Sequence, residues 1–78
     1  MSRLQRDVHP MPLFIKKELA GRGLMPAYRS RPAYQQNDYI GWITRAKLEA
    51  TRQKRLAQML DELDLGNVYM NMAWRPRG

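Results

Sequence analysis

Two successive stripes of apolar residues within residues 37–63 constrain the fold of this chain more than any other feature. The stripes are Tyr39, Trp42, Ile43 and Ala46, and then Leu56, Met59, Leu60 and Leu63. Each follows the i, i+3, i+4, i+7 spacing that places side chains on one face of an α-helix. The two stripes predict two amphipathic helices, which we expect to be joined by a short connection at Lys47–Glu49.

The remaining segments fit a small all-α fold. Pro12 and Gly21 bound a first short helix, because proline is favoured at the start of a helix and glycine just after its end. Pro32 is expected to begin the second helix and Gly66 to stop the third. We therefore predict a three-helix bundle with an extended C-terminal arm. Its parts are a flexible basic arm (residues 1–9), a helical module (residues 10–66) and the C-terminal arm (residues 67–78).

Gly41 lies inside the second predicted helix, opposite its apolar stripe. Glycine costs about 1 kcal/mol relative to alanine in a helix interior, so its presence requires a reason. A close approach by another backbone is one explanation. We favour the other, in which Gly41 lies on a solvated face.

The C-terminal arm has the two-residue period of a β-strand. Val68, Met70, Met72 and Trp74 alternate with the residues between them. A single strand has no partner, so the arm must pack across its own module, pair with a second copy, or add to the sheet of another protein. We expect packing on its own module, and we regard these four side chains as candidate contacts with a protein partner.

The charge of the chain is strongly basic. Fourteen Lys and Arg residues oppose seven Asp and Glu residues, which leaves a net charge of +7. Such a surplus favours acidic or phosphate-bearing partners, although solubility alone explains it in many small domains.

Several cations gather where the second and third predicted helices meet, in a cluster that we call the basic joint. Its members are Arg45, Lys47, Arg52, Lys54 and Arg55. A helix N-terminus offers unpaired N–H groups and a positive dipole end, both of which attract anions. The joint is therefore a candidate site for a phosphate or for the carboxylates of a partner. A solvated charged surface is the alternative.

Arg52 differs from the other cations because it falls within the apolar stripe of its helix, one turn before Leu56. A guanidinium in such a place extends toward water or finds an acceptor. Glu49, at i, i+3 spacing, and Asp38 are the candidate acceptors, so we expect a structural ion pair.

A second group of residues could contact nucleic acid. Tyr28 and Tyr34 flank Arg29 and Arg31, and aromatic side chains interleaved with cations can stack single-stranded bases. The chain shows no established nucleic-acid-binding motif, so this signal is weak.

The sequence offers no catalytic, cofactor or metal site. His9 lacks neighbouring ligands, whereas a metal site needs three or four that converge. There is no cysteine, and no apolar segment approaches the roughly 20 residues that span a membrane. We expect a cytoplasmic protein without cofactors and without enzymatic activity.

The helix pair resembles the bacterial YdeI/OmpD-associated family, also described as bacteriocin-protection proteins. The matching residues are Asp38-Tyr39, Trp42-Ile43, Ala46-Lys47, Thr51-Arg52 and Lys54-Arg55-Leu56. The family usually has Pro-Glu where this chain has Glu49-Ala50, which predicts a less rigid connection here. The resemblance covers roughly residues 11–63 and implies a compact helical module that is not an enzyme.

These observations predict a small interaction module that binds acidic protein partners. Nucleic-acid binding through phosphate contacts at the basic joint is the alternative. A further alternative is a structural subunit that is stable only as an oligomer or in a larger assembly, because so short a chain has a small core.

Overall fold

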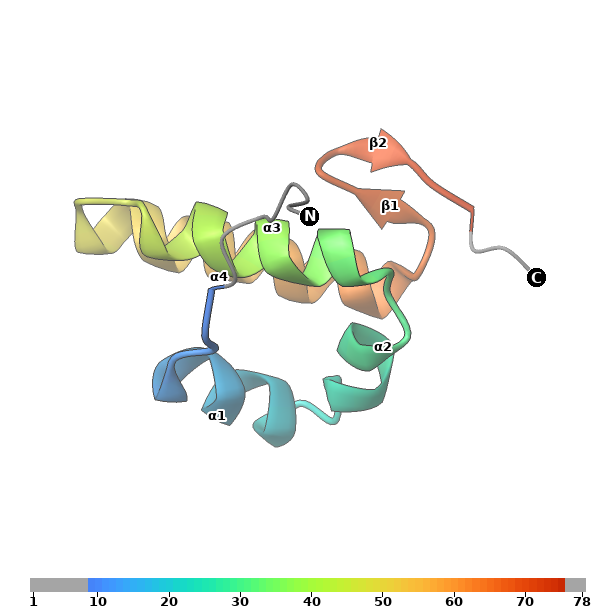
Figure 1. The fold of residues 1–78 in the computed structure, drawn as a ribbon, viewed down its shortest axis with the longest axis horizontal. Helices are drawn as coiled ribbons and strands as arrows, with labels where there is room; N and C mark the ends of the chain where they lie inside the picture. Colours follow the sequence, from blue (N-terminus) through green and yellow to red (C-terminus); the bar gives the residue numbers. More distant parts are fainter. Residues whose placement is uncertain (1–8, 76–78) are drawn as a thin grey trace, which may run out of the picture.

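The computed structural model describes residues 9–75, which form four helices and a β-hairpin (Figure 1). The elements are α1 (Leu13–Gly21), α2 (Met25–Arg29), α3 (Ala33–Thr44), α4 (Glu49–Leu65), β1 (Val68–Tyr69) and β2 (Met72–Ala73). The predicted all-α class is confirmed. The arm predicted over residues 1–8 lies outside the described residues, as do residues 76–78.

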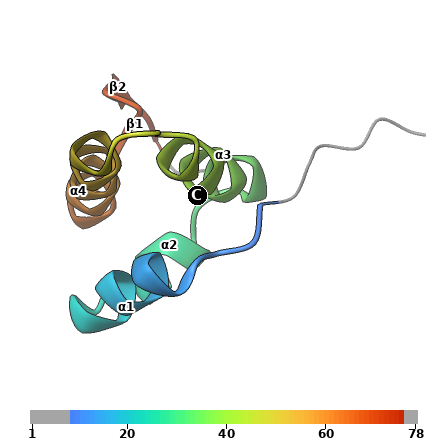
Figure 2. The ribbon, with the colours of Figure 1, turned by 90° about the vertical axis from the view of Figure 1, so that its left-hand side faces the viewer.

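The helices α3 and α4 run antiparallel, side by side, along the length of the molecule (Figure 1). Seen from the end of this pair, α1 and α2 lie together across one side of it (Figure 2). Pro32 directly precedes α3, and its carbonyl accepts the N–H groups of Gln35 and Gln36. Gly66 ends α4 in the left-handed conformation, with φ of 86°, which glycine adopts without a steric penalty.

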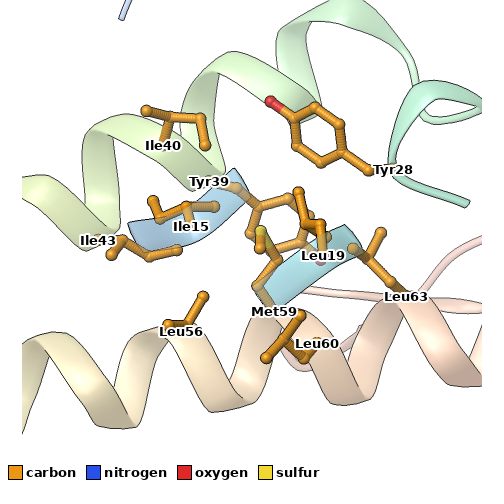
Figure 3. Close-up of a cluster of buried hydrophobic side chains, with 10 residues drawn as sticks. All are labelled: Ile15, Leu19, Tyr28, Tyr39, Ile40, Ile43, Leu56, Met59, Leu60 and Leu63. Atoms are coloured by element: carbon orange, nitrogen blue, oxygen red, sulfur yellow. The ribbon is translucent and has the colours of Figure 1, made fainter. Parts of the chain in front are cut away.

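Both predicted stripes face the core, which confirms the pattern that defines the fold. Ten buried side chains from α1 to α4 form the core (Figure 3), namely Ile15, Leu19, Tyr28, Tyr39, Ile40, Ile43, Leu56, Met59, Leu60 and Leu63. Trp42 is only half-buried and packs against the edge of this cluster. Ile40, which lay outside the predicted stripe, is also buried.

The connection between the first two predicted helices is itself partly helical. The predicted bundle has no helix between Gly21 and Pro32, whereas Met25–Arg29 forms the short helix α2. Pro26 stands in its first turn, where the missing N–H has no consequence. Tyr28 then buries its ring in the core, and this packing stabilises a turn that local propensity alone would not.

The interpretation of Gly41 as a residue on a solvated face was wrong. Gly41 is buried, and the imidazole of His9 packs on it. A Cβ atom at position 41 would lie 2.7 Å from His9 Nε2, closer than side chains tolerate. The backbone N–H of His9 also donates to Asn37 Oδ1 at 2.8 Å. His9 is therefore attached to α3 and does not belong to a flexible arm.

The C-terminal segment packs on its own module, as predicted, but it is not a single extended strand. The chain reverses at Met70 and Asn71, so that β1 and β2 pair antiparallel with Val68 opposite Ala73. Both loop residues have positive φ, of 52° and 65°, as a two-residue type I′ turn requires. The alternating pattern concealed the turn because neither residue is the glycine that normally marks one.

A buried carboxylate holds this turn in place. Glu62 is 3% exposed, and its Oε1 accepts the Tyr39 hydroxyl and, at 2.8 Å, the Met70 N–H. Its Oε2 accepts the Asn71 N–H at 2.9 Å and the Gln58 amide at 3.0 Å. The carboxylate thus joins α3, α4 and the hairpin loop, and it satisfies two N–H groups of a turn that carries no glycine.

The backbone of Glu62 is also an acceptor. Its carbonyl accepts the N–H of Gly66 at 2.9 Å and the guanidinium of Arg31 at 2.8 Å. Arg31 is 4% exposed, donates in addition to Gln35 Oε1, and lies 4.5 Å from the centre of the Trp74 ring. A fully buried arginine therefore links the segment before α3 to the end of α4 and to the residue after β2.

The hydrogen bonds of Glu62 also govern its protonation. Burial alone would raise the pKa of this carboxyl, but the bonds from Tyr39, Asn71, Met70 and Gln58 outweigh burial and hold the pKa below its ordinary value. Burial and the contact with Glu62 raise the pKa of the Tyr39 hydroxyl, which therefore keeps its proton and remains a donor.

Replacing Glu62 with glutamine is expected to lower the free energy of unfolding by about 2–3 kcal/mol, because an amide cannot accept from all the donors that surround it. Urea denaturation followed by circular dichroism measures the loss. Glu49→Gln, which removes an exposed carboxylate from the same helix, is the control and should cost less than about 1 kcal/mol. Equal stability of Glu62→Gln and the unsubstituted protein would contradict the assigned role.

The same carboxylate predicts a pH dependence of stability. Its pKa is lower in the folded state than in the unfolded chain, where the pKa of a glutamate is about 4.3. The stabilisation is therefore complete above that pH and is lost as the pH falls through the folded-state pKa. The difference in unfolding free energy between the unsubstituted protein and Glu62→Gln should accordingly shrink below about pH 4. A constant difference from pH 7 to pH 3 would contradict this.

Candidate functional site: the basic joint

The five predicted cations lie at one end of the α3–α4 pair. They occupy the C-cap of α3, the connection, and the first two turns of α4. Two exposed acids of α4, Asp61 and Asp64, lie near its other end, whereas the exposed Glu49 lies at the joint and pairs with Arg52. The helix pair is thus basic at the joint and acidic toward the hairpin.

Arg52 forms the ion pair predicted for it. Its Nη1 donates to Glu49 Oε1 at 2.7 Å, and its Nη2 donates to the carbonyl of Ala46 at 3.2 Å. It therefore fastens the connection to the first turn of α4. These bonds engage Arg52 within the protein, so its role at the joint is structural.

Arg55 is held by two contacts with α3. Its Nη1 donates to the carbonyl of Trp42 at 2.6 Å, and its guanidinium lies 5.3 Å from the centre of the Trp42 ring. The carbonyl of Trp42 is among the last four of α3, which have no partner within the helix. Arg55 therefore caps α3 from the neighbouring helix and rests on an aromatic face.

The other three cations are exposed. The side chains of Arg45, Lys47 and Lys54 form no hydrogen bond or ion pair among residues 9–75. Leu48, directly after Lys47, is 69% exposed. The tip of the joint thus presents an apolar side chain beside available cations.

The structure adds residues that the sequence analysis did not assign to a site. A surface pocket of about 200 Å³ is lined by Trp42, Thr51, Lys54, Arg55 and Gln58. Trp42 belongs to the first predicted apolar stripe, and Thr51 and Gln58 were not predicted as site residues. Thr51, Arg55 and Gln58 follow i, i+4, i+7 spacing, so a helical wheel of α4 would have placed them on one face.

The four candidate contacts of the C-terminal arm have different surroundings. Met70 packs against the core, Trp74 lies against Arg31, and Val68 is half-buried in β1. Met72, at 59% exposure, remains available on the surface. The hairpin therefore uses most of its apolar side chains within its own chain.

The stacking surface considered for single-stranded nucleic acid does not form. Tyr28 and Arg31 are buried, whereas Arg29 and Tyr34 are exposed. Tyr34 makes an edge-to-face contact with Tyr69, their ring centres being 6.0 Å apart. The alternation of aromatic and basic residues instead reflects packing at the start of α3.

Metal-binding and membrane-spanning features are absent from the described part of the chain. Within residues 9–75, no three histidine, cysteine, aspartate or glutamate side chains converge in a way that could hold a metal ion. None of the helices in this range combines the length and the apolar character needed to cross a membrane.

Replacing Arg55 with alanine should lower the free energy of unfolding by about 1–2 kcal/mol, because the carbonyl of Trp42 loses its charged donor and the indole loses its cover. Lys54→Ala, one position away and exposed, should change it by less than about 0.5 kcal/mol. Urea denaturation at pH 7 compares the two. Equal effects would show that Arg55 does not cap α3.

Comparison with known proteins gives one match. The family model for bacteriocin-protection, YdeI or OmpD-associated proteins matches residues 10–66, which span all four helices. No curated protein and no solved structure matches the chain. The resemblance seen in the sequence is thereby confirmed: the chain belongs to the bacteriocin-protection, YdeI or OmpD-associated (OmdA) family.

Proposed function

We propose that this chain is a non-enzymatic interaction module that binds an acidic segment of a partner protein at the basic joint. The observation that carries the proposal is the separation of charge along the α3–α4 pair. Exposed cations without internal partners occupy the joint, where the exposed acid Glu49 is paired with Arg52, and the exposed acids Asp61 and Asp64 lie at the other end of α4. Such an arrangement orients an approaching acidic partner toward one end of the molecule.

The exposed leucine at the joint favours a protein partner. Leu48 can bury apolar surface against another protein, and such burial contributes roughly 25 cal/mol per Å². A phosphate backbone offers no comparable apolar surface. Cations around an apolar contact are suited to an acidic peptide that also carries hydrophobic side chains.

The hairpin has a smaller part in this proposal than the sequence suggested. Met72 is the arm side chain that remains well exposed. Removal of residues 68–74 would also deprive Glu62 of two donors, so a truncation would test stability and not partner binding. Point substitutions at the joint are the informative change.

Charge reversal at the joint tests the proposal. Arg45→Glu with Lys47→Glu should weaken binding of an acetylated, fluorescently labelled octaglutamate peptide about tenfold, or about 1.4 kcal/mol, at low ionic strength. Fluorescence anisotropy measures the affinity. The control is Lys16→Glu with Lys17→Glu, on the exposed side of α1, which changes the net charge equally. Equal loss in both variants would mean that net charge alone governs binding and would overturn the proposal.

Nucleic-acid binding is the second candidate, and its salt dependence is a separate prediction. Five phosphate contacts would give a slope near −4.5 for log affinity against log salt on duplex DNA. Arg52 is already engaged by two protein acceptors, so four contacts and a slope of about −3.6 are expected if DNA binds at the joint. Titration of a 20-base-pair duplex between 50 and 200 mM salt measures the slope. DNA affinity above that for octaglutamate would favour this candidate over the first.

A further inference from the structure

The pocket beside Trp42 has a side-chain composition suited to an anion. It lies between α3 and the first half of α4, next to the exposed cations of the joint. Lys54 and Arg55 contribute positive charge to its lining, and Thr51 contributes a hydroxyl. None of its five lining residues is acidic.

Arg55 is fixed in place before any ligand binds. One Nη1 hydrogen is used by the carbonyl of Trp42, and the indole supports the guanidinium. A guanidinium has five N–H donors in a planar fork, so four donors remain. Since the side chain is already ordered, little conformational entropy is lost when those donors bind a carboxylate.

Gln58 completes the lining with its orientation already determined. Its amide nitrogen donates to Glu62 Oε2, so its carbonyl oxygen points away from that carboxylate. The side chains of Thr51 and Lys54 form no hydrogen bond among the described residues. The pocket therefore combines a fixed guanidinium with two further donors that have no partner in residues 9–75.

The size of the pocket limits the ligand. Sites for drug-sized molecules usually have about 300–1,000 Å³, whereas this pocket on the surface has about 200 Å³. A volume of this size suits one amino-acid side chain.

We infer that this pocket binds the side-chain carboxylate of one Asp or Glu in the acidic partner segment. The inference rests on the proposed function and adds a specific anchor to it. The carboxylate accepts from the remaining donors of Arg55 in a planar, two-bond arrangement, with Lys54 and Thr51 beside it. The exposed cations of the joint attract the segment, and the pocket fixes its register.

Nuclear magnetic resonance can test the anchor, because each tryptophan gives its own indole N–H signal. Trp42 lines the pocket, whereas Trp74 lies against Arg31 and serves as an internal control. Titration of the ¹⁵N-labelled protein with an acetylated, amidated tetraglutamate peptide should shift the Trp42 signal saturably and leave the Trp74 signal in place. The matched tetraglutamine peptide should shift neither.

Three variants distinguish the contribution of the planar guanidinium from that of positive charge alone. Arg55→Lys and Arg55→Gln should both lower the affinity for the tetraglutamate peptide at least fivefold, because neither side chain has the planar fork of donors. Thr51→Val should lower this affinity about twofold to threefold, because the hydroxyl is lost. The control Arg29→Lys, at an exposed position of α2, should bind like the unsubstituted protein. The amide spectrum of each variant verifies that it is folded.

Each outcome has a distinct meaning. Full affinity in folded Arg55→Lys, or shifts at Arg45 and Lys47 without one at Trp42, would overturn the anchor and leave the proposed function intact. No shift anywhere would overturn both. Tighter binding of a matched phosphoserine peptide, with the same shift of Trp42, would overturn the assignment of a carboxylate.

Discussion

The charged carboxylate of Glu62 is the constraint on which the rest of the structure depends. A buried carboxylate is costly unless every acceptor direction is met, and here donors arrive from α3, α4 and the hairpin loop. Each donor is in place only when its element is correctly positioned. The residue therefore couples elements that would otherwise depend on a small apolar core.

This coupling also sets the geometry of the basic joint. Contacts between the two long helices follow one another along the antiparallel pair, from Tyr39 with Glu62 through Trp42 with Arg55 to Ala46 with Arg52. Along α3 and its C-terminal extension each step is about one helical turn, whereas along α4 the first step is about two turns and the second about one. The register fixed at Glu62 is thus the register that places the guanidinium of Arg55 on the indole.

The sequence alone was sufficient to predict the two long helices, but not most of the polar contacts between elements. Apolar periodicity predicted α3 and α4 because one face of each must leave water, and i, i+3 spacing predicted the pair of Arg52 with Glu49. The burial of Arg31 and Glu62 was not predicted, since charged residues are rarely buried unless partnered, and their partners come from distant parts of the chain.

Other parts of the fold were missed for related reasons. A turn without glycine is stabilised here by a carboxylate eight residues earlier, which no local turn pattern can show. The glycine at position 41 reflects contact with His9, which lies far away in the chain. Four of the five residues that line the pocket lie on α4, but Trp42 joins them only when α3 and α4 are in register.

The arrangement of the elements leaves the joint unobstructed. The connection between α3 and α4 lies at one extremity of the molecule, and the β-hairpin lies toward the opposite one (Figure 1). A domain fused after the hairpin would consequently extend away from the cationic tip. A partner bound at the joint, as proposed, would therefore lie at the opposite end of the helix pair from such a fusion.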